Sequence, residues 1–322
     1  MDINQIRPSH LDELAKQAYS KDVLFYKSKL TSFTQRDCPG CGTSKADPFT
    51  DKDGFHYSRC LACHCIYMNP GPTEVLLEEF YKTSENYKFW AEFMYPESRI
   101  ERLKTIHRDR ADWISSFLSE KINGEESVSI LELGAGTGDT LTTLINSNST
   151  KICAYAIEPN PSMEPHLLSN GIRVISPVQL SEKGFLEKFD AIICFEVLEH
   201  LLEPSKTLKE MAVNLKKGGY FFASTPNAQS IEVQILKERS STLDIEHITV
   251  LTPASINALA AQGNYKVIEI KTPGSLDLEL IKRGEGNFCL TQGGHVVSGQ
   301  STQGFISDSG LSSHMKLILM RN

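Results

Sequence analysis

The sequence predicts an α/β protein with a mostly parallel sheet, preceded by a small metal-binding module. From residue 127 onward, short apolar runs alternate with amphipathic stretches, a pattern typical of successive βαβ units. Ahead of that region, five of the eight cysteines fall between Cys38 and Cys65. Such a cluster indicates a metal site rather than scattered thiols. A chain of 322 residues has room for about two domains of this kind.

Seven apolar runs have the length and composition of strands. They cover residues 128–133, 151–158, 172–176, 189–196, 219–225, 265–272 and 315–322. The stretches between them have helical spacing of apolar residues. We expect core helices at 140–146, 161–169, 180–187, 204–216 and 253–262, and earlier helices at 9–19 and 97–120. Thr252 before Pro253 predicts an N-cap followed by the first helical position.

These elements divide the chain into four predicted segments. They are an N-terminal helical segment (1–35), a zinc-binding module (36–70), a helical bridge or cap (71–126) and the α/β core (127–322). Within the core, residues 273–313 form an insertion rich in Gly, Ser and Gln. Loops of this length are usually functional or disordered, so the insertion is a candidate cover for a binding site.

The cysteine spacing predicts a structural zinc site. Two Cys-x2-Cys knuckles separated by eighteen residues are typical of four-thiolate zinc binding. Zn²⁺ prefers a tetrahedron of such ligands, and a closed set of four leaves no open position for chemistry. The predicted ligands are Cys38, Cys41, Cys60 and Cys63. His64 and Cys65 follow directly, so either can replace one ligand, and a set of buried or reactive thiols is the simpler alternative.

Composition excludes several classes of protein. Lys and Arg total 33 and Asp and Glu total 40, a net charge of −7, which disfavours a protein that wraps nucleic acid. No apolar run approaches the roughly 18–20 residues of a membrane span. The polar, acid-containing N-terminus resembles neither a secretory signal nor a transit peptide. We therefore expect a cytoplasmic protein, in which a disulfide framework is disfavoured.

A glycine-rich loop between the first core strand and its helix predicts a nucleotide-type cofactor site. Gly134, Gly136 and Gly138 allow the backbone to approach a ligand and leave amide donors at a helix N-terminus. The glycine pattern alone also occurs in NAD-binding proteins. Glu158 ends the next strand, where an acid suits a ribose diol. Glu132, beside the glycines, suits a cofactor with a positive or zwitterionic end.

Four motifs resemble those of class I S-adenosylmethionine-dependent methyltransferases. ELGAGTG at 132–138 resembles the first motif, and Glu158 in AIEPN resembles the acid that binds the ribose. FDAIICFEVLEHL resembles the fourth-strand motif, and LKKGGYFFASTPN resembles the fifth strand. The resemblance implies a Rossmann-like sheet of seven strands with the last antiparallel, and makes residues 127–322 the cofactor-binding methyltransferase domain.

The resemblance also implies which residues bind S-adenosylmethionine. The glycines would pack against the cofactor, Glu132 would organise its amino group, and Glu158 would take the ribose hydroxyls. Phe195 and Glu196 would line the methionine side, and Gln179 would lie near the adenine. The full predicted set is Glu132, Gly134, Ala135, Gly136, Gly138, Glu158, Pro159, Gln179, Phe195 and Glu196. For Glu196, Glu199 and His200, capping of a helix near Leu201 is an equal alternative.

The cysteine knuckles followed by the methyltransferase core give this chain an order similar to that of a bacterial subfamily with an N-terminal zinc-binding domain. Its members include nucleotide-sugar C-methyltransferases and relatives in surface-polysaccharide and natural-product pathways. The knuckles, Asn69-Pro70 and a helix ending at Phe80-Tyr81 carry this resemblance. In that subfamily a Glu-His pair lies at the reaction centre.

Glu246 and His247, in LDIEHITVLTP, match that pair. Tyr87, in SENYKFW, matches a substrate-facing tyrosine in a looser pattern. A histidine titrates near neutrality and can remove a proton from an acceptor. We therefore expect methyl transfer to a small-molecule or carbohydrate acceptor with His247 as general base, although a structural role for His247 in its loop is the alternative.

Three other functions remain alternatives. A zinc-module RNA methyltransferase is one, but residues 1–127 hold 17 Lys/Arg against 20 Asp/Glu, and an RNA-guiding module is usually basic. A non-catalytic S-adenosylmethionine-binding interaction protein is the second, and the intact glycines disfavour it. An NAD-dependent dehydrogenase is the third; it requires the glycines but not Glu132 and the ribose acid Glu158 together with the segment FEVLEHL at 195–201.

Overall fold

The computed structural model describes residues 3–121, 127–148, 150–273, 291–292, 295–296 and 307–322. Contacts divide the chain into two units. Unit 1 consists of Met1–Phe33, Pro72–Ile193 and Asn214–Lys216, and unit 2 consists of Thr34–Gly71, Cys194–Val213 and Lys217–Asn322. The four-segment division remains a prediction. In the structure, residues 34–71 group with the C-terminal part of the core.

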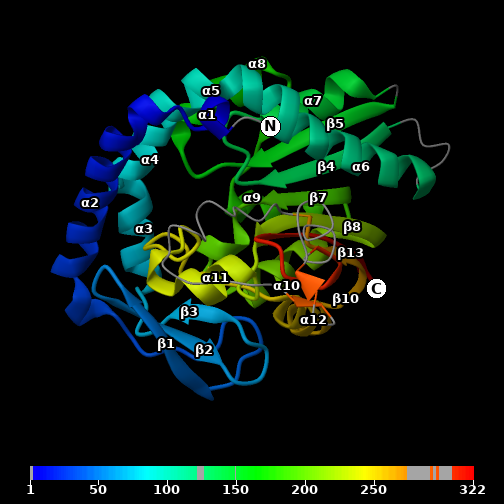
Figure 1. Cartoon of the computed structure of the whole chain (residues 1–322). Coiled ribbons are helices and arrows are strands. Elements are labelled where there is room, and N and C mark those ends of the chain that lie inside the picture. Colours follow the sequence, from blue (N-terminus) through cyan, green and yellow to red (C-terminus); the bar gives the residue numbers. More distant parts are fainter. Residues whose placement is uncertain (1–2, 122–126, 149, 274–290, 293–294, 297–306) are drawn as a thin grey trace. The chain divides into compact units, whose positions relative to one another are not determined.

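A seven-stranded mixed sheet has the order β10-β13-β8-β7-β4-β5-β6 (Figure 1). Its strands are β4 (Ser127–Leu133), β5 (Lys151–Ile157), β6 (Arg173–Val174), β7 (Phe189–Phe195), β8 (Leu215–Pro226), β10 (Tyr265–Lys271) and β13 (His314–Arg321). β4, β5 and β6 pair in parallel, whereas β13 pairs antiparallel with both β8 and β10. The predicted α/β fold, its seven strands and its antiparallel last strand are confirmed.

The sequence of β7 explains its place inside the sheet. Every residue of FDAIICF is buried, as expected for a strand covered on both faces. Asp190 is the one acid in this run, and its carboxylate is paired. It accepts a hydrogen bond from the backbone N–H of Ser129 (2.9 Å) and one from Nζ of Lys216 (2.6 Å). Burial of this charge is therefore offset by two charge-assisted hydrogen bonds.

Helices form the N-terminal part of unit 1. They are α1 (Ile3–Ile6), α2 (Asp12–Ser28), α3 (Glu74–Thr83) and α4 (Glu85–Phe89). Asp22 on α2 is buried and accepts hydrogen bonds from Oγ of Ser84 (2.6 Å) and from the N–H groups of Glu85 and Asn86. A residue distant in sequence therefore satisfies the first turn of α4. Tyr26 on α2 and Phe80 on α3 stack with their ring centroids 4.5 Å apart.

The predicted helix at 97–120 is present but interrupted. α5 (Tyr95–Arg102) and α6 (Arg108–Lys121) are separated by a π-helical turn at Leu103–His107, and a similar turn at Trp90–Met94 precedes α5. The remaining helices of unit 1 are α7 (Asp139–Ser147), α8 (Glu164–Ser169) and α9 (Pro177–Leu180). A π turn adds one residue to a helical repeat, which the spacing of apolar residues did not reveal.

The predicted helix at 180–187 is wrong. α9 ends at Leu180 and only a 3-10 turn follows, at Lys183–Phe185. The side-chain amide of Asn214 donates to the carbonyls of Leu180 (2.8 Å) and Phe185 (3.1 Å). These two carbonyls are satisfied by a distant side chain, so the segment needs no helical hydrogen bonds at these positions.

Unit 2 contains a second sheet that the sequence did not predict. Its strands are β1 (Ala46–Lys52), β2 (Phe55–Cys60), β3 (Ile66–Met68) and β9 (Thr249–Val250), in that order (Figure 1). Every pair is antiparallel. The helices are α10 (Pro204–Asn214), which ends in unit 1, α11 (Ile231–Leu236) and α12 (Pro253–Gln262). Thr252 caps α12 through the N–H of Ser255, as predicted.

Most of the predicted insertion at 273–313 lies outside the described residues. Within it, β11 (Thr291–Gln292) pairs with β12 (His295–Val296). The proposed covering role of the insertion remains a prediction. Among the described residues, no helix is long and apolar enough to cross a membrane.

Candidate functional site

The glycine loop follows β4 in a conformation that requires glycine. The φ angles of Gly134, Gly136 and Gly138 are 66°, 54° and 75°, in the left-handed region where a Cβ atom causes strain. A Cβ on Gly138 would also lie 2.6 Å from side-chain atoms of Leu167 and Ile172. The N–H of Gly138 donates to the carbonyl of Ala135 (2.9 Å). This tight turn brings the chain from β4 directly into α7.

Glu158 is held at the end of β5, against the glycine loop. Its Oε2 accepts a hydrogen bond from the N–H of Gly136 (2.7 Å), and its Oε1 accepts one from the N–H of Asn160 (2.9 Å). Burial raises the pKa of Glu158, whereas these two bonds act in the opposite direction. Pro159 follows directly. The carboxylate is therefore oriented by the same loop that would contact a cofactor.

Glu132 is a buried acid with an unsatisfied oxygen. It lies in β4 with only 4% of its surface exposed, and Oε2 has no hydrogen-bond partner among the described residues. Burial raises the pKa of Glu132 to about 8. A buried unsatisfied carboxyl oxygen is costly, and an ammonium group would satisfy it. The two carboxyl groups of unit 1, Glu132 and Glu158, are therefore acceptors that fit the amino group and ribose hydroxyls of S-adenosylmethionine.

Two other predicted site residues of unit 1 have local partners. The side-chain oxygen of Gln179 accepts from the N–H of Ser176 (2.8 Å) in a capping box. Tyr87 lies in α4, and its ring packs edge-on against Tyr81 at 5.2 Å. The predicted contacts of Gln179 with adenine and of Tyr87 with the acceptor remain predictions.

Phe195 and Glu196 lie where β7 ends, in unit 2. Phe195 is buried, and Glu196 adopts a left-handed φ of 56°. The carboxylate of Glu196 accepts from Oγ of Ser224 and lies 3.2 Å from Nε2 of His314. This strained backbone sets Glu196 apart from the regular strand that precedes it.

His247 is oriented by its own loop. Its Nδ1 donates to the carbonyl of Thr242 (2.9 Å) and lies 3.5 Å from Oδ2 of Asp244. Asp244 Oδ1 accepts the N–H groups of Glu246 and His247, both at 2.8 Å. Since Nδ1 carries the hydrogen, Nε2 of the neutral ring carries the lone pair. Asp244 was not predicted, although its position three residues before His247 was a local signal.

His200 lies beside His247. Their ring centroids are 4.9 Å apart, and Nδ1 of His200 donates to the carbonyl of Glu246 (3.0 Å). Burial, followed by the neighbouring His247, lowers the pKa of His200 to about 4, so this ring is neutral. α10 begins at Pro204, beyond the 3-10 turn Leu198–His200. The two rings come from segments far apart in sequence, so their contact was not predictable.

Glu199 completes this cluster. Its Oε2 accepts from Oγ1 of Thr225 (3.0 Å), whereas Oε1 is buried and has no hydrogen-bond partner among the described residues. Burial, and then the nearby Glu196, raises the pKa of Glu199 well above its usual range. One ligand atom each from Glu199, His200 and His247 lies within 4.8 Å of the others.

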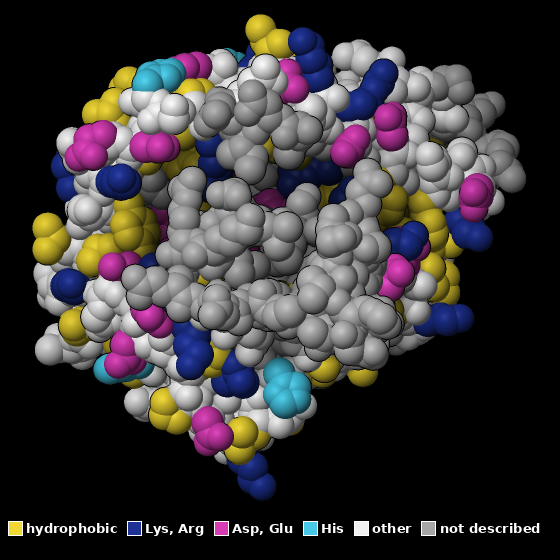
Figure 2. Space-filling model, viewed as in Figure 1, with side chains coloured by type: hydrophobic (Ala, Val, Ile, Leu, Met, Phe, Trp, Pro, Cys, Tyr) yellow, Lys and Arg dark blue, Asp and Glu magenta, His cyan; other side chains and the backbone are white. Residues whose placement is uncertain are grey.

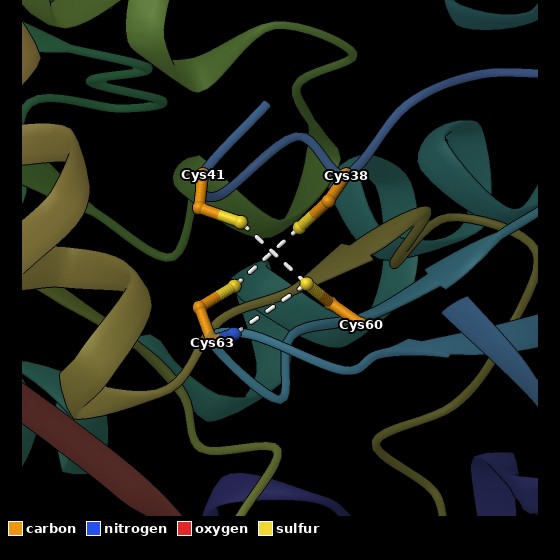
Figure 3. Close-up of side chains that lie close together, drawn as sticks. All are labelled: Cys38, Cys41, Cys60 and Cys63. Atoms are coloured by element: carbon orange, nitrogen blue, oxygen red, sulfur yellow. Dashed lines mark hydrogen bonds between the residues drawn. The ribbon is translucent and has the colours of Figure 1, made fainter. Parts of the chain in front are cut away.

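The four predicted cysteine ligands converge on one point (Figure 3). Sγ of Cys38 is 3.4 Å from Sγ of Cys63, and Sγ of Cys41 is 3.5 Å from Sγ of Cys60. The N–H groups of Ala62 and Cys63 donate to Sγ of Cys60. Four sulfurs at this separation fit a tetrahedral zinc ion. Neither the exposed His64 nor the buried Cys65 belongs to this four-sulfur group.

Comparison with known proteins identifies the family of the core. A family model described as "Methyltransferase domain" matches residues 97–270. The chain is 31% identical over 138 residues to a ubiquinone biosynthesis O-methyltransferase of Dechloromonas aromatica (strain RCB), covering 41% of this chain and 56% of that protein. The corresponding protein of Xylella fastidiosa (strain M23) is 30% identical over 158 residues, covering 46% and 61%. The chain thus spans less than two thirds of these relatives.

Among solved structures, magnesium protoporphyrin IX methyltransferase from Synechocystis PCC 6803 with bound SAH is 11% identical. The match covers 78% of this chain and 100% of that one, with a TM-score of 0.48.

The cysteine geometry predicts one zinc ion per chain. Elemental analysis of the purified protein should find it, and the double variant Cys38→Ser/Cys60→Ser should contain none. Cys153→Ser is the matched control, because Cys153 lies outside the four-sulfur group. Wild-type protein with clearly less than one zinc, or a zinc-replete double variant, would contradict the site.

The buried Glu132 predicts a pH-dependent stability. Its pKa is raised in the folded protein from 4.5 to about 8, so between these values the folded state retains a proton that the unfolded state releases. The free energy of unfolding should therefore fall as pH rises through this window, by about 1.4 kcal/mol per unit. Urea unfolding of wild type and Glu132→Gln from pH 5 to pH 8 measures this, and a constant difference between them would refute the assignment.

Proposed function

The chain belongs to the methyltransferase domain family, and on that premise we propose that it transfers a methyl group from S-adenosylmethionine to a small-molecule or carbohydrate acceptor. The observation that carries this proposal is the set formed by Glu132, the left-handed glycine turn and Glu158. An unsatisfied buried acid and an oriented carboxylate at the ends of two neighbouring strands, with the glycine turn between them, suit this cofactor.

We assign the cofactor contacts as follows. Glu132 takes the amino group, Glu158 takes the ribose hydroxyls, and the turn at Gly134, Gly136 and Gly138 allows close approach of the backbone. The other predicted contacts are Ala135, Pro159, Gln179, Phe195 and Glu196. When bound, the cofactor supplies an electrophilic methyl group on a sulfonium sulfur. The protein has to position the acceptor and remove its proton.

His247 is the proposed general base. Because Thr242 holds its Nδ1–H, the lone pair on Nε2 is available to take a proton from the acceptor as the methyl group is transferred. The carboxylate of Asp244, 3.5 Å from Nδ1, stabilises the imidazolium that forms. Glu246 contributes its backbone to the same loop. Tyr87 is assigned to the acceptor, and Cys38, Cys41, Cys60 and Cys63 to a structural zinc ion.

The acceptor class is inferred from the relatives and from the charge of the chain. The matched relatives are named O-methyltransferases, which supports a hydroxyl acceptor. The resemblance to sugar C-methyltransferases makes a sugar the first class to test, methylated on oxygen or on a carbon beside a carbonyl. The net charge is −7, and on the face drawn in Figure 2 acidic and basic side chains are interspersed. Both favour a small acceptor over RNA.

Gly136→Arg should abolish cofactor binding, because the side chain would occupy the space through which the loop contacts the cofactor. Isothermal titration with S-adenosylmethionine measures this. Gly171→Arg is the matched control, since Gly171 has a similar left-handed φ (74° against 54°) and neither glycine has an atom within 4 Å of its Cβ position. Unchanged affinity in Gly136→Arg would defeat the site assignment, and a wild type that binds no cofactor would defeat the proposed function.

His247→Ala should lower turnover by roughly 10²–10⁴-fold, as expected for loss of a general base, and should leave cofactor affinity near that of wild type. Transfer of a tritiated methyl group to a panel of nucleotide sugars and simple phenols measures turnover. His10→Ala is the control, because this exposed histidine pairs with Glu97 and neither residue belongs to the proposed site. Near-wild-type turnover in His247→Ala would remove this residue from the mechanism.

A further inference from the structure

The segment that carries His247 continues directly into the sheet of the zinc module. β9 begins two residues after His247, at Thr249, and pairs with β3 through Ile66↔Val250 and Tyr67↔Thr249. The N–H of Met68 donates to the carbonyl of Ile248 (3.1 Å). All three residues of β3 are fully buried. Hydrogen bonds to β3 therefore hold the backbone on the C-terminal side of His247 in place.

Side chains of the module hold the same segment upstream of His247. The hydroxyl of Tyr57, in β2, donates to the carbonyl of Asp244 (2.6 Å), and Nζ of Lys52 donates to the carbonyl of Ser240 (2.8 Å). Asp244 is the residue whose carboxylate receives the N–H of His247. Both sides of the His247 turn are thus attached to strands of the module.

The cysteine knuckles contact the far end of this segment. Oγ1 of Thr252, the N-cap of α12, donates to the carbonyl of Cys63 (2.6 Å). A Cβ on Gly40, in the first knuckle, would lie 2.7 Å from Cβ of Ser255, so this knuckle packs closely on the start of α12. Cys60 ends β2, and Cys63 lies three residues before β3. The sulfurs therefore determine the connection between the two strands that hold the segment.

Arg36 attaches the His200 turn to the same sheet. Its guanidinium donates to the carbonyl of Leu202 and to Oγ1 of Thr249 (3.3 Å), and Oγ1 of Thr249 in turn donates to the carbonyl of Leu201 (2.8 Å). The guanidinium also lies 5.9 Å from the ring centroid of Tyr67 in β3. Both neighbouring imidazoles thus lie on backbone that the module holds.

We propose that the zinc module positions the His200–His247 pair, so that zinc occupancy controls methyl transfer and leaves cofactor binding intact. The path runs from the four sulfurs through the β2–β3 connection to β9 and His247, and it rests on the proposed role of His247. Glu132, the glycine turn and Glu158 belong to unit 1, whereas the module and both histidines belong to unit 2. Tyr57 and Arg36 are positioning residues that act through the backbone.

The decisive variant is Tyr57→Phe, which removes one hydroxyl and leaves all four cysteines. Tyr265→Phe is the matched control: its hydroxyl is also buried in unit 2 and donates to a backbone carbonyl, that of Leu208, outside the His247 segment. Both variants should keep one zinc per chain, similar melting temperatures and wild-type cofactor affinity. Only Tyr57→Phe should lower kcat, by about tenfold, and shift the NMR signals of the His247 ring, assigned by their loss in His247→Ala.

Zinc removal by chelation tests the same path in the intact chain. The His200 and His247 ring signals should shift and turnover should fall at least tenfold, while the affinity for S-adenosylmethionine stays within about twofold. Added zinc should restore the ring signals and the turnover. Three results would overturn the proposal. The histidine ring signals do not change when zinc is removed, zinc removal abolishes the affinity for S-adenosylmethionine, or Tyr57→Phe has the same kcat and ring signals as Tyr265→Phe. The ring signals report on this path even if no methyl transfer is found, which keeps the two proposals separate.

Discussion

The left-handed turn between β4 and α7 is the constraint on which the cofactor side of this protein depends. Only glycine tolerates the φ values at Gly134, Gly136 and Gly138 without strain, and only this turn directs the N–H of Gly136 at the carboxylate of Glu158. The glycine turn therefore holds together the ends of the parallel strands β4 and β5 and the carboxylate of Glu158. A side chain in the turn would disturb all three.

Two buried acids show where the structure tolerates electrostatic cost. Glu132 and Glu199 each retain one buried carboxyl oxygen without a partner among the described residues, and burial raises the pKa of both. An apolar residue would pack at either position without that penalty. Buried ionisable groups with raised pKa values concentrate at functional sites. This is consistent with one acid in the proposed cofactor site and the other beside the proposed base.

The zinc module belongs structurally with the half of the core that contains the two histidines. Its sheet is completed by β9 (Thr249–Val250), which comes from the core sequence and pairs with β3 (Ile66–Met68). A module of this size has too small an apolar core to be stable alone and usually needs a metal or a partner surface. Here β9 supplies the partner surface, and the four sulfurs would supply the ligands of the zinc ion that we propose.

The sequence by itself determined the α/β class, the seven core strands, the glycine loop with its two acids and the four cysteines. These features are local: they appear as apolar runs, fixed spacings and turn residues. The helix predicted at 180–187 is absent because the side chain of Asn214, distant in sequence, bonds the carbonyls of Leu180 and Phe185. The short polar strand β1 was not predicted, because its pairing with β2 makes it a strand and its own residue pattern does not indicate one.

Only the tertiary structure decided which of these residues meet. It brought His200 against His247 and paired β3 with β9. It also inserted the last strand, β13, between β8 and β10. Each of these contacts joins segments through backbone hydrogen bonds or ring packing that local patterns do not encode. A sequence pattern records which side chains are present along the chain, whereas long-range pairing determines which of them act together.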